Sequence, residues 1–208
     1  MKNTLRAQYR NLRDAWDRGL AWECQRAAIA FLILALLAFG ACMASPVLLE
    51  KAVGFLTDVV GNLEVQNEDG SLSALALFLK NFEATTMIMA YGLIPFLQLS
   101  AMSLGVNAVL LGIMAAWYLT NGYSVAAYLA ALVPHGIFEL PALVCAFGVG
   151  LFVCGQLSRR IRHDETALPF WNCLVLISEA LVLVLLPLLV VAALVEAYIT
   201  PITASWFF

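Results

Sequence analysis

The chain has 208 residues, of which 63% are hydrophobic and 12% are charged, and its formal net charge is −3. Soluble proteins carry about a quarter charged residues, so this composition, with its mean hydropathy of +0.90, excludes an ordinary soluble enzyme. The apolar runs also lack the alternating polarity of the strands in a membrane β-barrel. We therefore predict an all-α fold, a polytopic helical membrane protein with about five transmembrane helices and additional amphipathic interfacial helices.

Residues 1–26 precede the first apolar run and are rich in arginine. Leu5, Tyr9, Leu12 and Trp16 recur at helical spacing, which is typical of an amphipathic helix on the anionic cytoplasmic leaflet. Residues 27–48 are long and apolar enough to cross about 30 Å of hydrocarbon. We predict the first span there, retained as a helix and not removed as a signal segment.

Residues 50–83 are acidic and carry an apolar stripe in each half, separated by a turn-like segment at 66–71. Neither half is long and free enough of charge to cross, so we expect an outer interfacial segment. Residues 84–119 are apolar but interrupted by Gly92, Pro95 and Gly105. We predict spans 2 and 3 there, the second span starting as early as Leu77.

Residues 122–157 are expected to hold a re-entrant or interfacial segment before Pro134 and then span 4, and residues 171–198 hold span 5. Basic segments at the N-terminus and at 159–162 should both stay in the cytoplasm, which five crossings allow. We therefore expect a single membrane domain, residues 1–208, in the cell (inner) membrane, with its C-terminus outside. The five cysteines show no CxxC pair, so neither a disulfide framework nor a zinc site is predicted.

Few polar side chains lie within the predicted spans, where an ionised group costs about 2.5–3.5 kcal/mol at the bilayer centre on insertion scales. His135 and Glu139 are the most isolated, because no other acidic or basic side chain lies between Glu83 and Arg159. Their spacing places them on one helical face. We predict that Pro134 starts this helix and that Pro141 bends it. The remaining polar residues of interest are Asn107, Asn121, Glu179 and Glu196.

Three hypotheses for the His135/Glu139 pair stay open. The pair holds helices together through hydrogen bonds, or it forms part of an ion, proton or metal site on a transport path. A metal at His135/Glu139 is then possible, although we predict no cofactor. An intramembrane metal-dependent hydrolase is the least favoured, because HGIFE lacks the second histidine of HExxH. For Glu179 we expect a structural role, whereas either role is open for Glu196.

An ordered set of motifs resembles one known family. Its specific part is PHGIFELPA at residues 134–142, and its weaker parts are Lys80-Asn81-Phe82, Asn107, Asn121-Gly122 and Glu196–Pro201. Over roughly residues 75–201 this set resembles the stage II sporulation protein M family. The resemblance implies a multi-spanning membrane protein in which one polar centre gathers Asn81, Asn107, Asn121, His135, Glu139 and Glu196.

The resemblance also implies a function. Sporulating relatives act as a scaffold that recruits cell-wall-degrading partners during engulfment, and many other relatives occur in organisms that do not sporulate. We therefore expect a non-enzymatic scaffold for cell-envelope remodelling or engulfment partners. The alternative is a transporter or channel that passes an ion or small solute by the His135/Glu139 cluster. Expected partners are membrane lipids, envelope proteins and a second copy of the chain, with no nucleic acid.

Overall fold

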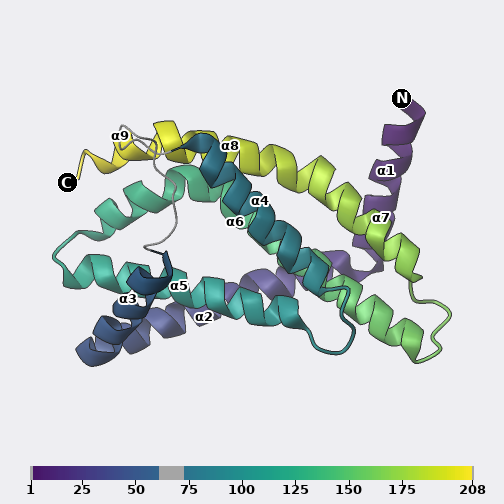
Figure 1. Cartoon of the computed structure of the whole chain (residues 1–208), viewed down its shortest axis with the longest axis horizontal. Helices are drawn as coiled ribbons and strands as arrows, with labels where there is room; N and C mark the ends of the chain where they lie inside the picture. The colour runs from purple at the N-terminus through teal and green to yellow at the C-terminus, as the bar shows by residue number, and fades with distance from the viewer. Residues whose placement is uncertain (1, 61–72, 208) are drawn as a thin grey trace. The chain divides into compact units, whose positions relative to one another are not determined.

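The computed structural model describes residues 2–60 and 73–207, and the regular structure of these residues is helical throughout, without a strand (Figure 1). This confirms the predicted all-α fold. The elements in chain order are α1 (Lys2–Ala15), the π-helical turn η1 (Trp16–Leu20), α2 (Ala21–Ala44), α3 (Pro46–Val60), α4 (Ala74–Tyr91), α5 (Leu99–Thr120), α6 (Val125–Ile161), α7 (Phe170–Ala180), a second π-helical turn η2 (Leu181–Leu185), α8 (Leu186–Tyr198) and α9 (Thr200–Ala204).

Within the described residues, 4 helical stretches are long and apolar enough to cross a membrane: Tyr9–Ala44, Leu99–Thr120, Val125–Ile161 and Phe170–Tyr198. The expected second span corresponds to α4, which is 18 residues long. It contains Lys80 and Glu83 and is not among the 4. The turn expected at 66–71 lies outside the described residues.

Helix α6 is continuous over 37 residues and includes Pro134 and Pro141. The re-entrant segment expected at 122–133 is therefore not separate: from Val125 onward its residues are the first turns of α6. Proline lacks the N–H that would bond the carbonyl four residues earlier, here that of Ala130. The Thr203 hydroxyl of α9 lies 3.0 Å from this carbonyl oxygen, so the acceptor freed by Pro134 has a donor. The helix can pass the proline for that reason.

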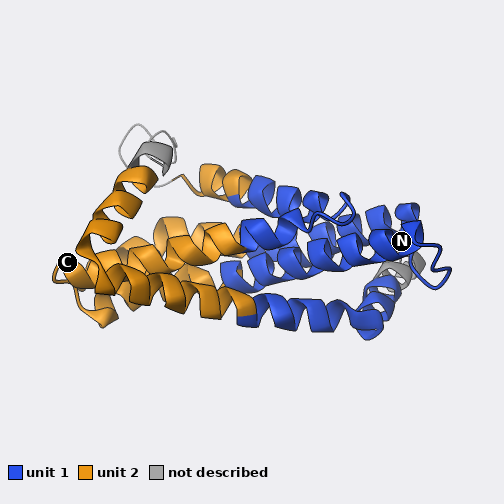
Figure 2. Ribbon diagram, turned by 90° about the horizontal axis from the view of Figure 1, so that it is seen from below, with its two compact units in different colours: residues 1–29, 81–104, 139–189 blue, residues 30–80, 105–138, 190–208 orange. Residues whose placement is uncertain are grey.

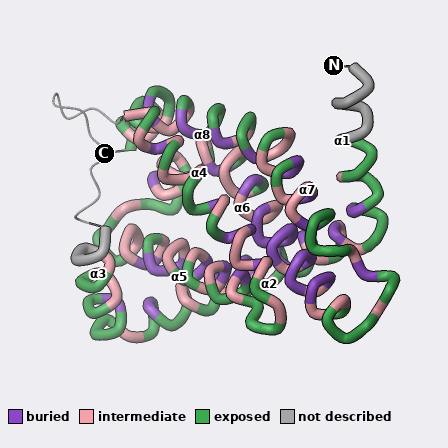
Figure 3. The backbone as a smooth tube through the Cα atoms, turned by 45° about the vertical axis from the view of Figure 1, so that its right-hand side comes forward, coloured by how far each residue is buried: buried purple, intermediate pink, exposed green. Residues whose placement is uncertain are grey.

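Two compact units account for the chain, each drawn in its own colour in Figure 2. Unit 1 comprises residues 1–29, 81–104 and 139–189, and unit 2 comprises residues 30–80, 105–138 and 190–208. In unit 1 the second part of α6 is the central element. Residues 146–150 are buried at every position (Figure 3), as expected for a helix that has neighbours on all sides.

Small residues allow the close packing of unit 1. A Cβ atom on Gly150 would clash with the Ser100 side chain and the Ile88 carbonyl, and one on Gly92 would clash with the Gly150 backbone. The Ser100 hydroxyl donates to the Ile88 carbonyl at 2.8 Å, so this contact is also satisfied in its hydrogen bonds. At the N-terminal end, Gly19 has a φ of 121°, which only glycine adopts readily. It turns the chain from α1 into α2, and α1 contacts α7.

Unit 2 has two apolar clusters. One gathers Cys42, Leu49, Ile113 and Ala116 from α2, α3 and α5. The other joins Leu77 of α4 to Ala193 and Ala197 of α8. Where α5 ends and α6 begins, an aromatic group surrounds the connection, as is common near a membrane–water interface. Its members are Trp117, Tyr118, Tyr123 and Tyr128.

The connection between α6 and α7 is held by ion pairs. Arg159 lies 2.7 Å from Asp164, and Arg160 lies 2.8 Å from Glu165. The hydroxyl and the backbone N–H of Thr166 also donate to Asp164. The Thr166 hydroxyl, and after it the Arg159 guanidinium, lowers the pKa of Asp164 to about 2, because both stabilise the ionised carboxylate.

Candidate functional site

His135 lies in α6, within unit 2, and its half-buried ring contacts α9. Its Nδ1 atom is 3.2 Å from the hydroxyl oxygen of Thr200, which also lies 3.3 Å from the Val195 carbonyl. Threonine has one hydroxyl proton. When Thr200 donates this proton to Val195, the His135 Nδ1–H donates to Thr200; in the other tautomer, Thr200 donates to Nδ1. The ring is therefore held by Thr200 in both neutral forms.

Helix α9 contacts α6 at a second point one turn further on. Thr203 reaches the Ala130 carbonyl, which Pro134 leaves without its helical donor. Its hydroxyl is equally 3.0 Å from the Thr200 carbonyl, so the two acceptors share one proton. Hydrogen bonds between membrane helices contribute about 0.6 kcal/mol on average and at most about 1.7 kcal/mol. Two such contacts hold the Thr200–Thr203 turn of α9 against the Pro134 region of α6.

A carboxylate approaches the His135 ring. A Glu196 oxygen of α8 lies within 4.8 Å of a ring nitrogen, and Glu139 follows His135 by one turn of α6. All three residues are of intermediate burial. Imidazole and carboxylate ligands together suit zinc and other divalent transition metals. The same groups can also exchange a proton, so the arrangement fits both the structural and the ion-site hypotheses for His135.

The asparagines implied by the resemblance do not all behave alike. Asn121 is exposed at the end of α5, where its side-chain amide donates to the Trp117 carbonyl at 2.8 Å. The same carbonyl also accepts the Asn121 backbone N–H at 3.1 Å, so the side chain and the backbone of Asn121 both bond to the C-terminal end of the helix. Asn107 is half-buried in α5 of unit 2, and Asn81 is half-buried in α4 of unit 1.

Glu179 is a polar residue whose surroundings the sequence did not reveal. It lies in α7, is only 5% exposed, and accepts a hydrogen bond of 3.0 Å from Asn11 of α1. Its second oxygen, Oε2, is buried and has no hydrogen-bond partner among the described residues. The sequence did give one signal, which is an acidic residue inside an apolar run that contains no lysine or arginine to pair with it. The partner could not be found from sequence because Asn11 is 168 positions away.

The helices and the polar groups define an integral membrane protein whose apolar helices carry a few polar side chains turned toward protein. A family model described as stage II sporulation protein M matches residues 28–201, most of the chain, and the protein belongs to this family. The predicted resemblance is thereby confirmed. No curated protein and no solved structure matches the chain.

Proposed function

We propose that the protein is a non-enzymatic membrane scaffold that holds cell-envelope-remodelling proteins in place, including engulfment partners where the cell sporulates. The observation that carries this proposal is the bond from His135 to Thr200. This hydrogen bond joins His135, the most isolated polar side chain in the sequence of the spans, to a neighbouring helix, as a rigid scaffold requires. Family membership supports the same function.

The scaffold acts in the cell (inner) membrane, with its N-terminus in the cytoplasm and its C-terminus outside. This topology needs five crossings, and hence a crossing by α4. At 1.5 Å per residue, its 18 residues extend about 27 Å, close to the hydrocarbon thickness of about 30 Å. With four crossings the connection containing Arg159, Arg160 and Arg162 would face outside, against the preference of short basic segments for the cytoplasm.

Cysteine labelling tests the orientation. Glu165 and Trp206 are exposed, so Glu165→Cys and Trp206→Cys should react readily with a membrane-impermeant maleimide. We expect labelling of Trp206→Cys in intact cells or spheroplasts, and labelling of Glu165→Cys only after lysis. The five native cysteines are buried or half-buried, and the unsubstituted protein serves as the background control. Labelling of Glu165→Cys from outside would overturn the proposed topology.

Cross-linking in living cells tests the scaffold itself. An impermeant cross-linker applied from outside should join the protein to cell-wall-degrading or other envelope-remodelling proteins, and His135→Ala combined with Thr200→Val should reduce that yield. A protein cross-linked only to lipids, or only to further copies of itself, contradicts the scaffold. Recovery with itself as well as with an envelope protein indicates a homo-oligomeric scaffold.

The second candidate function is the passage of a cation or proton, and the Glu196 carboxylate beside His135 favours it. Intramembrane ionisable groups that surround one point commonly mark ion pathways. Purified protein in liposomes should then give cation or proton flux above that of empty liposomes, and Glu196→Gln should abolish it. Flux that Glu196→Gln removes, with unchanged cross-linking to envelope proteins, would replace the scaffold proposal by the transport one.

A further inference from the structure

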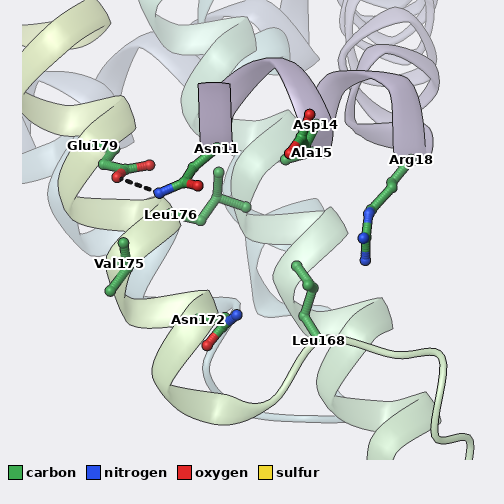
Figure 4. Close-up of a pocket in the computed structure, with 9 residues that line it drawn as sticks. All are labelled: Asn11, Asp14, Ala15, Arg18, Leu168, Asn172, Val175, Leu176 and Glu179. Atoms are coloured by element: carbon green, nitrogen blue, oxygen red, sulfur yellow. Dashed lines mark hydrogen bonds between the residues drawn. The ribbon is translucent and has the colours of Figure 1, made fainter. Parts of the chain in front are cut away.

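A cavity of about 340 Å³ lies in unit 1 between α1, the connection after α6, and α7 (Figure 4). Its volume is in the range of small-molecule sites. Of the described residues that line it, five are polar, namely Asn11, Asp14, Arg18, Asn172 and Glu179, and the others are apolar. An apolar wall with a few polar groups that converge on one space is the usual form of a ligand site.

Glu179 is the part of this cavity that calls for a ligand. The side chain is 5% exposed, and Asn11 satisfies only Oε1. No side chain or backbone group in the described part of the chain donates to the buried Oε2, although a carboxylate inside a protein is normally paired or fully hydrogen-bonded. Figure 4 shows the carboxylate beside Asn11, on the wall that faces α1. A ligand that donates an N–H to Oε2 would complete the site.

The other charges restrict what this ligand is. Arg18 reaches the cavity from α1's side, away from Glu179 in Figure 4, and Asp14 lies between them on the same element as Asn11. Within the described part of the chain, Arg18 forms no ion pair. Its guanidinium presents several donors suited to a phosphate or a carboxylate. The cavity thus offers a carboxylate for a cation and a guanidinium for an anion.

We propose that this cavity binds a small zwitterion, whose primary ammonium group donates to Glu179 and whose phosphate or carboxylate contacts Arg18. The ammonium must carry N–H donors, because Oε2 lacks a hydrogen bond as well as a countercharge. A quaternary ammonium has none and is excluded. The Asn11 and Asn172 amides supply further donors and acceptors around the ligand. Two sources carry this chemistry, the phosphoethanolamine headgroup of a membrane lipid and a free phosphoethanolamine or amino acid.

Binding to the full-length protein distinguishes these sources. Purified protein is placed in nanodiscs of phosphatidylcholine alone, or of phosphatidylcholine with phosphatidylethanolamine, and thermal unfolding is recorded. Soluble O-phosphoethanolamine and glycine are titrated into the phosphatidylcholine sample by calorimetry. Stabilisation by phosphatidylethanolamine identifies the lipid as the source, whereas saturable binding of the soluble compounds without a lipid preference identifies a free zwitterion. Phosphocholine should not bind in either case.

Variants locate the site. Glu179→Gln retains an acceptor for Asn11 but loses the charge, and we expect it to weaken binding of the zwitterion about tenfold or more, as for loss of a charge-assisted hydrogen bond. Arg18→Gln should weaken the binding of phosphoethanolamine more than the binding of ethanolamine, because ethanolamine has no phosphate group. Asp17→Asn is the matched control, because Asp17 is exposed in η1 and does not line the cavity.

The proposal is overturned by any of three results: no zwitterion binds and no lipid preference exists, phosphocholine binds as well as phosphoethanolamine, or Glu179→Gln binds like the unsubstituted protein. Folding of the variants is checked by their unfolding in phosphatidylcholine alone. If Glu179→Gln does not fold, Arg18→Gln, which replaces an exposed side chain, still tests the proposal. Its ratio of phosphoethanolamine affinity to ethanolamine affinity should be lower than that of the unsubstituted protein.

Discussion

Units 1 and 2 each place a polar side chain within an apolar helix, and they satisfy it differently. In unit 2 the His135 ring is bonded to Thr200, and the carbonyl freed by Pro134 is bonded to Thr203. In unit 1, one oxygen of Glu179 is bonded to Asn11, and the other lies beside a cavity and has no partner within the described ranges. A satisfied polar group fixes helices, whereas an unsatisfied one in a cavity identifies a place for a ligand. The hydrogen bonds of such a polar side chain therefore indicate its role better than its isolation in the sequence does.

The largest effect is expected from Gly150→Ala, which tests the close packing of unit 1. The added Cβ would meet the Ser100 side chain and the Ile88 carbonyl, and overpacking of this kind costs about 1–3 kcal/mol. Gly155→Ala in the same helix is the control, because a Cβ there meets nothing within 4 Å. Replacing a helical glycine by alanine gains up to about 1 kcal/mol, so the control should unfold at an equal or higher temperature. Equal unfolding temperatures for the two variants would contradict the close packing in unit 1.

Asn11→Ala should follow, because it removes the amide that donates to Glu179. Hydrogen bonds to charged groups contribute about 1.5–3 kcal/mol, so we expect a loss of about 2 kcal/mol in the free energy of unfolding. Asn172→Ala removes an exposed amide from the same cavity and should change stability by less than about 0.5 kcal/mol. Thermal unfolding of both variants in one detergent measures the difference. If Asn11→Ala is as stable as Asn172→Ala, Glu179 is not held as the structure indicates.

Local signals in the sequence were sufficient for the fold class. Long apolar runs predict helices because backbone groups in a bilayer must bond within their own segment. The first span, expected at 27–48, is formed by α2, Ala21–Ala44. It begins earlier than predicted, and its first turns accommodate Glu23 and Arg26 as an ion pair of 3.3 Å. The charged residues near its start thus lie inside the helix. The start of the helix therefore differs from the prediction, whereas the helix itself was predicted.

The features that depend on distant residues could not be predicted. Pro134 is a strong local signal for a helix start, yet α6 continues through it because Thr203 satisfies the carbonyl of Ala130, from which it is 73 positions away. The role of Glu179 likewise depends on α1. For His135 the sequence did indicate an inward-facing polar residue, but not that Thr200 would be its partner. Tertiary contacts decided each of these cases, and a single sequence does not contain their pairing.

A double-mutant cycle on His135→Ala and Thr200→Val gives a smaller effect and sharpens the contrast with Glu179. Because the two side chains share one hydrogen bond, the double variant should lose less stability than the sum of the single losses. We expect a coupling free energy of about 0.6 kcal/mol, the measured average for hydrogen bonds between membrane helices, and at most about 1.7 kcal/mol. Addition and removal of zinc during the same unfolding experiments separates the hypotheses for His135. A coupling of zero, or stabilisation by zinc that both variants abolish, would favour an ion site at His135 over a hydrogen bond that holds α9 against α6.

The smallest effect is expected at the connection between α6 and α7, where pH acts on a partly exposed contact. The pKa of Asp164 is lowered to about 2, first by the Thr166 hydroxyl and then by Arg159, from an ordinary value of 3.8. Because the folded-state pKa is the lower one, the stabilisation is complete above pH 3.8 and is lost as the pH falls through about 2. Hydrogen exchange of the Thr166 amide should accelerate relative to its intrinsic rate over this interval. Asp164→Asn should show fast exchange at every pH, since it removes the charge, and Glu165→Gln should retain the transition. A Thr166 amide whose protection is constant from pH 5 to pH 2 would show that the Asp164 contacts do not order this connection.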